Sequence, residues 1–524
     1  MNRQIFIGCD IGTSGTKAVA TDKDGHILSQ SSTTYGIIQL HNNWAEQDPD
    51  VWLEAAVSTI HAVISSLPPQ DSSIEAICIS ALYGGTGAMC DESMKSVRPA
   101  LIWMDRRAEK ERRMVEETIG RERIFQTTGN GTDSYFGYTK LLWVKENEPE
   151  NWEKIRHILP IHSYILYKMT GKLTVDYCSA GNVGGIYDYS THSWSKDMCR
   201  EMGIPYEALP KDFHSPSDII GTVTPEYQKK LGLSSPVPMC AGTVDCIASM
   251  LSAGIVRPGD NAAVLGTSLN WGYIHDRRPD NPDLVSMPYC IEPSRFSYTY
   301  GGSSTAGALP RWFANQFMGD DTSRTYDELE QMILSQNIGP GSDGLVALPY
   351  FMGERTPIWD EKASGVLFGL TLSHTKGHIY RALLESVAYS LRHIMESMTD
   401  SDLAIEKIVL VGGGARSSIW KQIFADVTGL PILTPVQEIE APLGDAFLAA
   451  VGAGFITDYS RMGEWLTMNP AILPSAKAHE QYNEYFTIYK ELYPVLKETM
   501  SKRADILKYN YYLIRRKGDV SYES

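Results

Sequence analysis

The chain is 524 residues long, with 43% hydrophobic and 21% charged residues, which is the composition of a globular protein rather than a fibrous or disordered one. Its formal net charge of −16 argues against nucleic acid or an anionic membrane as the main partner, because either requires a concentrated basic face. Single cores stop growing at about 250 to 300 residues. We therefore expect two domains, residues 1–253 and 254–500, and a C-terminal tail, residues 501–524.

Charge and cysteine patterns exclude other classes of site. One basic cluster lies at residues 106–113, but acidic residues interrupt it, and we interpret it as a solvated face. The eight cysteines form no CxxC pair and no Cys/His cluster with metal-ligand spacing, so we expect reduced thiols in a cytoplasmic protein. Asp10 interrupts the N-terminus before a secretory apolar segment forms, and no run approaches the roughly 18 to 20 apolar residues of a membrane span.

The first half alternates between predicted strands and helices. Residues 4–35 read as a β-meander with turns at 12–15 and 22–25. A helix follows, with Asp48 as N-cap and Pro49 at its first position. Its apolar residues recur at helical spacing: Trp52, Ala56, Ile60 and Val63. A buried strand at 74–80 comes next, and the alternation to about residue 240 predicts an α/β fold.

The first glycine turn has the residue types of a phosphate site. Asp10 closes an apolar strand, where a carboxylate is costly unless it meets a cation or donors. Water-bridged Mg²⁺ is one interpretation, and a simple turn-former is the other. The small residues, hydroxyls and cation that a triphosphate needs come next, at Gly12, Thr13, Ser14 and Lys17. The turn is not a Walker A loop, because no GxxxxGK[ST] segment occurs.

Asp245 follows a small-residue turn and opens a predicted helix, so its carboxylate should lie near a helix N-terminus. A plain cap is the simple interpretation. Beside a bound substrate, the same carboxylate could accept the proton of an attacking alcohol.

The second half repeats the Gly-Thr-Ser turn between two apolar runs, at Gly266, Thr267 and Ser268. A predicted helix at 378–398 carries one apolar stripe. The strand at 407–411 then leads into three glycines, which include Gly413 and Gly414. Such a turn lets backbone approach a flat ligand such as a purine, and a loop without ligand is the alternative.

Six segments in order carry a family resemblance: GCDIGTSGTK, YFGYTKLLWVKENEP, AGTVD, LGTS, LPYFMGERTPIWD and VGGGARSS. Over residues 4–500 the chain resembles the FGGY family of carbohydrate kinases, within the actin, hexokinase and Hsp70-like ATPase superfamily. The resemblance implies an α/β fold of two actin-like (ribonuclease H-like) ATPase domains. ATP, Mg²⁺ and a small sugar or polyol would bind in the cleft between them, and a phosphoryl group would pass to a sugar hydroxyl.

The resemblance also assigns roles. Asp10 helps to position Mg²⁺, and Asp245 is the catalytic base. The triphosphate lies beside Thr13, Ser14 and Lys17, with Gly12 in the same turn and with Gly266, Thr267 and Ser268 as a second clamp. The adenosine pocket includes Gly413, Gly414 and Arg416.

The acceptor end departs from the family pattern. After the strand at 74–80, glycerol kinases place Arg-Glu and xylulokinases Met-His, whereas this chain has Tyr83 and Gly84. Trp103 and Asp105 match the family's substrate-lining segment, with a purely structural pair as the alternative. Family frequency favours a pentulose such as xylulose. The alternatives are gluconate, a hexulose, erythritol or another polyol, and a non-catalytic nucleotide-binding regulator. Homodimers are common in the family, but one sequence shows no interface.

Overall fold

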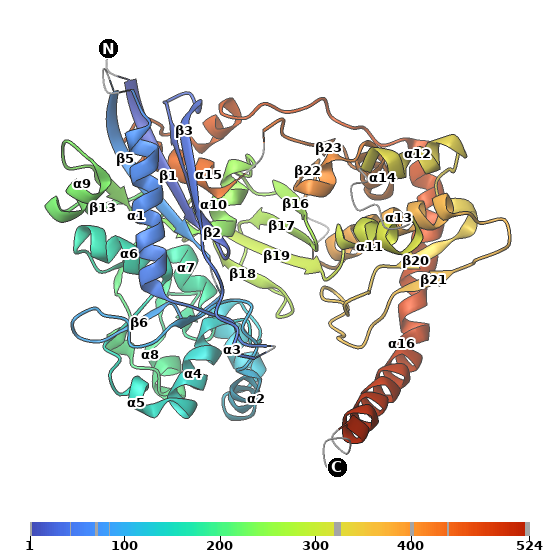
Figure 1. Cartoon of the computed structure of the whole chain (residues 1–524), viewed down its shortest axis with the longest axis horizontal. Helices are drawn as coiled ribbons and strands as arrows, with labels where there is room; N and C mark the ends of the chain where they lie inside the picture. Colours follow the sequence, from blue (N-terminus) through green and yellow to red (C-terminus); the bar gives the residue numbers. More distant parts are fainter. Residues whose placement is uncertain are drawn as a thin grey trace. The chain divides into compact units, whose positions relative to one another are not determined.

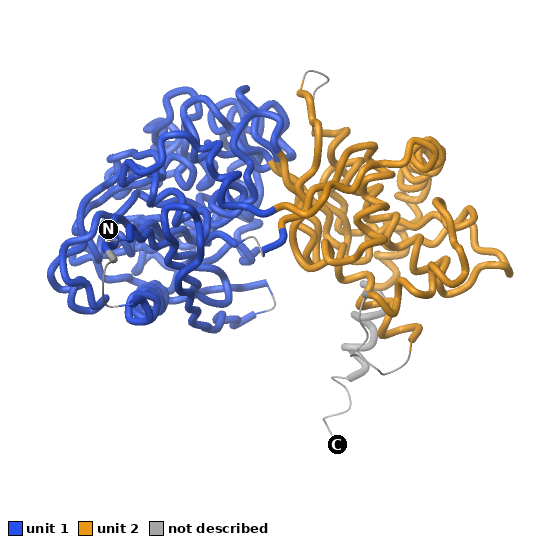
Figure 2. The backbone as a smooth tube through the Cα atoms, turned by 90° about the horizontal axis from the view of Figure 1, so that it is seen from above, with its two compact units in different colours: residues 1–260, 273–299, 436–467 blue, residues 261–272, 300–435, 468–524 orange. Residues whose placement is uncertain are grey.

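The computed structural model describes residues 3–41, 43–68, 72–82, 84–318, 326–398, 403–437 and 440–518 (Figure 1). Its contacts divide the chain into two compact units (Figure 2). The first unit contains residues 1–260, 273–299 and 436–467, and the second contains residues 261–272, 300–435 and 468–524. The chain therefore returns to its first unit near the C-terminal end, which no local sequence pattern indicated.

The first unit is built on a mixed sheet in the order β13-β14-β5-β1-β2-β3, with β15 also paired to β5. The predicted meander is confirmed, because β1, β2 and β3 pair antiparallel in sequence order. Strands β5, β14 and β15 instead run parallel to their neighbours β1 or β5. The strands are β1 Arg3–Ile11, β2 Gly15–Thr21, β3 Ile27–Thr34, β5 Ser72–Ala81, β13 Ile219–Thr222, β14 Pro238–Cys240 and β15 Thr243–Val244.

Helices α1 (Pro49–Ser65) and α15 (Ala441–Gly452) cover opposite faces of this sheet (Figure 1). Side chains alternate between the two faces of a strand. The odd-numbered residues of β1 join a core with α1. On the other face, a Cβ at Gly8 would lie 1.9 Å from the carbonyl oxygen of Pro442, so α15 crosses β1 with no room for a side chain. The predicted cap of α1 is confirmed, because Asp48 accepts the amide of Asp50.

The first unit has further helices, short strand pairs and a second cluster of buried apolar side chains. The helices are α2 Glu109–Thr118, α3 Arg121–Thr128, α4 Gly137–Asn147, α5 Pro149–Trp152, α6 Ile161–Thr170, α7 Tyr177–Asn182, α8 Lys196–Met202, α9 Pro225–Leu231 and α10 Asp245–Ser252. Of these, α2, α3, α4, α7 and α8 contribute to the second cluster, whereas α6 and α9 pack into the core with α1. The strand pairs are β4 Glu46–Gln47 with β7 Ala100–Leu101, β6 Ala88–Cys90 with β8 His157–Leu159, β9 Thr174–Asp176 with β12 Asp212–His214, and β10 Tyr187–Asp188 with β11 Ser193–Trp194.

The second large sheet has the order β18-β19-β17-β16-β22-β23. Its strands are β16 Asn261–Leu265, β17 Leu269–His275, β18 Val285–Pro288, β19 Ser297–Ser303, β22 Ile408–Val411 and β23 Ile432–Leu433, and a separate pair is formed by β20 Val346–Leu348 and β21 Val366–Phe368. Strand β22 runs parallel to both of its neighbours, β16 and β23. Their carboxyl ends therefore meet at one edge of the sheet.

Helix α13 (Lys376–Met398) is the centre of the second unit's helical layer, and it packs against the other four helices there: α11 Ala308–Phe317, α12 Tyr326–Ser335, α14 Ser418–Thr428 and α16 Ala476–Gly518. Burial extends beyond the predicted apolar stripe. Arg381 and Glu385 are buried and form an ion pair of 2.8 Å, and both bond the hydroxyl of Tyr482. The pair satisfies two charges that would otherwise be costly inside a core.

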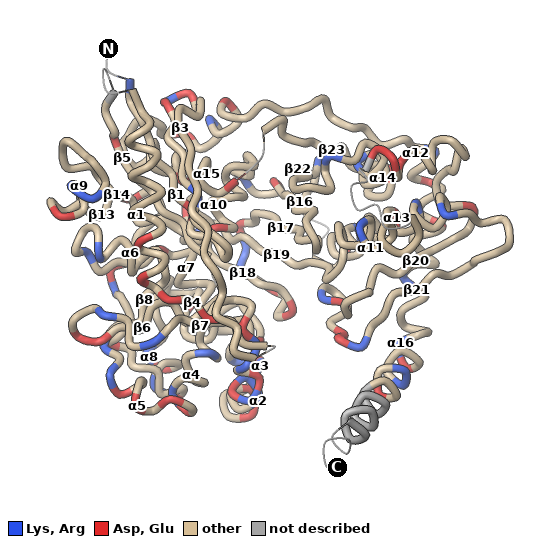
Figure 3. The backbone as a smooth tube through the Cα atoms, in the orientation of Figure 1, with Lys and Arg blue, Asp and Glu red and all other residues tan. Residues whose placement is uncertain are grey.

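Basic and acidic residues are interspersed along the described chain, and α2 carries both (Figure 3). The prediction of a solvated face at residues 106–113 is wrong for Arg107, which is buried and forms ion pairs with Glu46 and Asp105. All eight cysteines are unpaired, and seven of them are buried. Among the described residues, no helix combines the length and apolar character that crossing a membrane requires.

Candidate active site

The two predicted catalytic carboxylates meet at one edge of the first sheet. Strands β1 and β15 both run parallel to β5, with Ile11 and Val244 in register with Ala81. Asp10 is the penultimate residue of β1, and Asp245 follows β15 as the first residue of α10. Because parallel strands end at the same edge, two carboxylates separated by 235 positions become neighbours.

Both carboxyl groups have a raised pKa. Burial raises the pKa of Asp10 well above its ordinary value, and the charge of Asp245 raises it further. Burial also raises the pKa of Asp245 to about 7, against the opposing hydrogen bond from the amide of Cys246 at 2.6 Å. A carboxyl group with a pKa near neutral can take up and release a proton under physiological conditions.

A third carboxylate, Asp445, lies behind this pair and was missed by the sequence analysis. It belongs to α15 and is fully buried. The hydroxyl of Ser80 donates to Asp445 at 2.7 Å and approaches Asp10 at 3.3 Å. Burial raises the pKa of Asp445 well above its ordinary value. An acidic residue inside the apolar segment 441–452 was the signal that could have found it.

The first glycine turn is held from outside its own strands. The amide of Gly12 donates to the carbonyl of Gly15 at 2.9 Å, which closes the turn. Tyr35 donates its hydroxyl to the Gly12 carbonyl at 2.7 Å, and Gln47 donates to the Thr13 carbonyl at 2.8 Å. These bonds fix the carbonyl oxygens away from a ligand that the turn would bind through N–H groups.

The two flanking side chains of the turn are placed differently. Ser14 is exposed on the turn itself. Lys17, on β2, forms an ion pair with Glu440. Its side chain is half exposed. A partly exposed ammonium with one carboxylate partner can exchange that partner for a phosphate oxygen at small cost.

The predicted acceptor residues lie next to this turn. The indole of Trp103 donates to the hydroxyl oxygen of Thr13 at 2.9 Å, and 40% of the Trp103 residue is exposed. Gly84 has φ +76°, and a Cβ there would lie 2.7 Å from the Tyr135 ring and 3.0 Å from Cβ of Trp103. The turn at Gly84 is therefore enclosed by two aromatic side chains. Tyr83 lies outside the described residues.

Asp105 is fully buried, and its carboxylate already has protein donors. One oxygen accepts the amide of Ala45 at 2.7 Å, and the guanidinium of Arg107 donates to both oxygens at 2.6 to 3.0 Å. These bonds anchor the segment that carries Trp103. A direct contact of Asp105 with a substrate stays a prediction.

In the second unit, the two remaining predicted turns meet at one sheet edge. Val264 and Val411 are in register on the parallel strands β16 and β22, so Gly266 and Gly412 follow strands that end together. A Cβ at Gly412, where φ is +95°, would lie 2.7 Å from the Leu265 carbonyl oxygen. A Cβ at Gly413 would meet nothing within 4 Å. Gly413 therefore leaves open space, whereas Gly412 permits close approach of backbone.

The carbonyls of the Gly-Thr-Ser turn point toward helix α11. The Gly266 carbonyl accepts the amide of Gly307 at 2.8 Å, and the Thr267 carbonyl accepts the amide of Ala306 at 2.9 Å. Gly266 and Thr267 are exposed, and Ser268 is partly exposed. The neighbouring 3-10 turn, Gly413–Arg416, packs Gly414 against Leu265 and leaves Arg416 exposed. This sheet edge thus presents two adjacent turns with few side chains.

Family models match most of the chain. The FGGY family of carbohydrate kinases, N-terminal domain, matches residues 5–252, and the FGGY family of carbohydrate kinases, C-terminal domain, matches residues 261–453. The chain belongs to the FGGY family of carbohydrate kinases. This FGGY kinase accordingly has the two-domain actin-like ATPase fold that its sequence predicted, and it is an ATP-dependent phosphotransferase that acts on a carbohydrate.

Relatives of this FGGY kinase align along nearly their full length. The xylulose kinase of Bacillus subtilis (strain 168) is 28% identical over 494 residues, which cover 94% of this chain and 97% of the relative. The gluconokinase of the same organism is 26% identical over 509 residues, which cover 95% of this chain and 98% of the relative. The crystal structure of xylulose kinase from Rhodospirillum rubrum superposes with a TM-score of 0.88 at 27% identity, covering 95% of this chain and 100% of that chain.

Proposed function

We propose that this FGGY kinase phosphorylates a pentulose, and that its acceptor is xylulose. Support comes from the relatives named xylulose kinase in Bacillus subtilis, Staphylococcus epidermidis and Escherichia coli, each aligned over 94% or more of this chain. Gluconate is the second candidate, because a gluconokinase aligns over the same length at nearly the same identity.

The proposal divides the work between the two parts of the chain. Residues 1–253 would hold the sugar, the first phosphate turn and the base. Residues 254–500 would hold the second phosphate turn and adenosine, through Gly266–Ser268 and through Gly413, Gly414 and Arg416. The open space at Gly413 and the exposure of Gly266 and Thr267 support this assignment, since each is compatible with a ligand lying against backbone.

Asp10 would hold Mg²⁺ through water, and the ion would neutralise charge on the phosphates when bound. The fit rests on the position of Asp10 beside Asp245, because a nearby cation relieves the repulsion between two partly buried carboxylates, and this repulsion is one cause of the raised pKa of Asp10. Among the described residues, no group of three or more His, Cys, Asp or Glu side chains could coordinate a metal ion directly. Water ligands would therefore complete the coordination.

Asp245 would act as the general base. A sugar hydroxyl ionises far above neutral pH, so an early loss of its proton is unfavourable. In a loose phosphoryl-transfer transition state the acceptor oxygen gains positive character late, and its proton then passes to the Asp245 carboxylate. The Cys246 amide bonds one carboxylate oxygen and so fixes the rotation of the group. The observation that carries the proposal is the meeting of Asp10, Asp245 and the first glycine turn at one sheet edge.

The test is a coupled assay of ADP release over a panel of pentuloses, hexuloses, polyols and aldonates. Xylulose should give the highest kcat/KM. Gluconate in first place would replace the proposed acceptor but keep the catalytic assignment. If no acceptor stimulates turnover of ATP, the chain acts as a nucleotide-binding regulator, and the catalytic assignment fails.

A further inference from the structure

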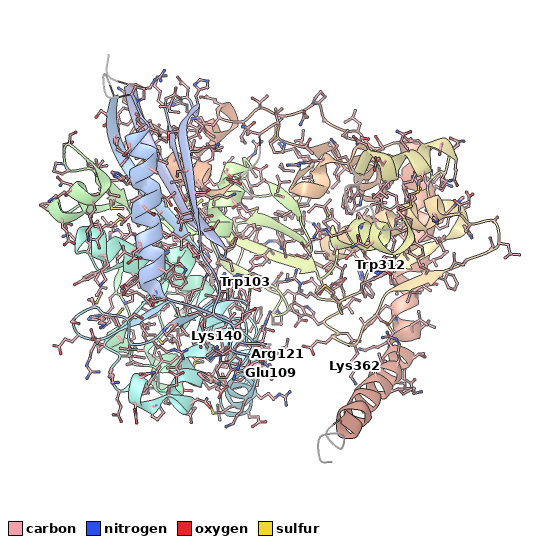
Figure 4. All side chains as sticks on the ribbon, in the orientation of Figure 1. Trp103, Glu109, Arg121, Lys140, Trp312 and Lys362 are labelled. Carbon is pink, nitrogen blue, oxygen red and sulfur yellow. The ribbon has the colours of Figure 1, made fainter. Side chains whose placement is uncertain are left out.

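Lys140 is a fully buried lysine that the assignments above do not use. It lies on α4, and its ammonium donates to the carbonyl oxygen of Gly84 at 2.5 Å and to that of Tyr135. Figure 4 labels it together with Trp103 in the first unit. A buried ammonium is retained in a core only where donors and acceptors are closely matched. The two carbonyl partners therefore indicate what Lys140 holds in place.

The electrostatic surroundings of Lys140 are nearly balanced. Asp105 and Asp133 favour its charged form, whereas Arg106 and Arg107 oppose it. Burial outweighs these charges and lowers the pKa of Lys140 to about 7. Arg107 already bonds Asp105, and Arg106 already bonds Asp133. The hydrogen bonds of the ammonium thus go to two backbone carbonyls, and their effect is to hold two loops together.

Those loops flank the acceptor side of the site. The turn at Gly84 lies against Trp103 and Tyr135, as described above. Gly85, the next residue of the turn, packs on α4, because a Cβ at Gly137 would lie 2.1 Å from the Gly85 carbonyl oxygen. Thr86 continues the connection, since its amide donates to Leu101 at 3.0 Å. The turn Gly84–Thr86 is therefore fixed to α4 on one side and to the Trp103 segment on the other.

We propose that Lys140 is a positioning residue for the sugar acceptor: it clamps the carbonyls of Gly84 and Tyr135 and so fixes the turn that flanks Trp103. The inference rests on the proposed function and on the sequence-based prediction that Gly84 and Trp103 line its acceptor site. Loss of the clamp should loosen acceptor binding and leave the nucleotide turns unaffected. If Lys140 were purely structural, its replacement would instead change the stability of the protein and the KM values of both substrates together.

The test compares Lys140→Met with Lys145→Met. Lys145 is a matched control, because it lies on the same helix and donates to a backbone carbonyl, that of Met202, at 3.2 Å. In Lys140→Met we expect the acceptor KM to rise at least about tenfold, as for a lost hydrogen bond to a charged group, with the ATP KM within twofold. Lys145→Met should change neither. Equal rises in both KM values for Lys140→Met would overturn the proposal.

Hydrogen exchange separates this inference from the proposed function, because it needs no substrate. Amides of Gly84–Gly87 should exchange faster in Lys140→Met than in the wild type or in Lys145→Met. If no sugar is phosphorylated, the proposed function fails while this exchange still decides whether Lys140 holds the turn. Unchanged exchange would refute the clamp, and faster exchange with an unchanged acceptor KM would refute its role in acceptor binding.

Gly137→Ala provides a second variant should Lys140→Met fail to fold. Its methyl group would press on the Gly85 carbonyl and displace the same turn while leaving Lys140 in place. It too should raise the acceptor KM with the ATP KM unchanged. An acceptor KM equal to that of the wild type would count against the turn as an acceptor element.

Discussion

Replacing Asp245 with Asn tests the proposed base with little change in shape. The Asn side chain keeps an oxygen that can accept the amide of Cys246, so the rotation of the group should be retained. General bases contribute about 10²- to 10⁴-fold to rate, which corresponds to roughly 2.7 to 5.4 kcal/mol of transition-state stabilisation. We expect kcat to fall by that factor while the Kd for ATP stays within about twofold.

The pH dependence of kcat/KM tests the same base independently. With a pKa of about 7, Asp245 is ionised in roughly a tenth of free enzyme molecules at pH 6 and in about nine tenths at pH 8. Because the base must be ionised to accept a proton, kcat/KM for the sugar should rise about tenfold over this interval. In Asp245→Asn, the rise of kcat/KM between pH 6 and 8 should disappear together with most of the activity.

The assay is steady-state ADP release at constant ionic strength, with ATP binding followed separately by calorimetry. Asp197→Asn is the control, since that carboxylate is exposed and, among the described residues, forms an ion pair with Arg200 alone. It should leave both the rate and the pH profile unchanged. An Asp245→Asn enzyme with normal turnover, or a wild-type profile flat between pH 6 and 8, would refute Asp245 as the base.

Three further predictions concern the metal, the nucleotide and stability. Asp10→Ala should raise the Mg²⁺ concentration needed for half-maximal rate, and an unchanged metal titration would contradict its role. Gly413→Ala should leave the unfolding midpoint in urea unchanged, because its methyl group meets nothing within 4 Å, yet raise the ATP KM; a normal ATP KM would contradict the adenosine assignment. Burial raises the pKa of Glu354 to about 7 from an unfolded value near 4.5, so the folded state holds the extra proton and stability falls as pH rises between these values. Urea unfolding at pH 5 and pH 8 should show a decrease of up to about 3 kcal/mol that is smaller in Glu354→Gln, and equal decreases would contradict the assignment.

Local signals predicted the elements that build the site. Asp48 and Pro49 define the start of α1 because capping depends on nearest neighbours. The Gly-Thr-Ser turns follow β1 and β16 as expected, and Asp245 begins α10. Each of these features is fixed by residues within a few positions of one another.

Contacts between distant segments could not be predicted in this way. Ser80 and Asp445 are separated by 365 positions, and their hydrogen bond exists only because residues 436–467 return to the first unit. Arg107 was interpreted as a surface charge in a charged segment, but Glu46 and Asp105 satisfy it inside the core. Whether a charged residue is buried or exposed depends on partners that its own segment does not contain.

The glycines of the family motifs satisfy two different constraints. Gly8 and Gly414 have no space for a Cβ, since one would overlap α15 and the other the Leu265 side chain. Gly266 and Gly413 have space, with no atom nearer than 3.8 Å to an added Cβ. The first pair is required by packing and the second leaves backbone open to a ligand. Both constraints exclude side chains, so a single motif indicated the fold and the site together even though different glycines serve each.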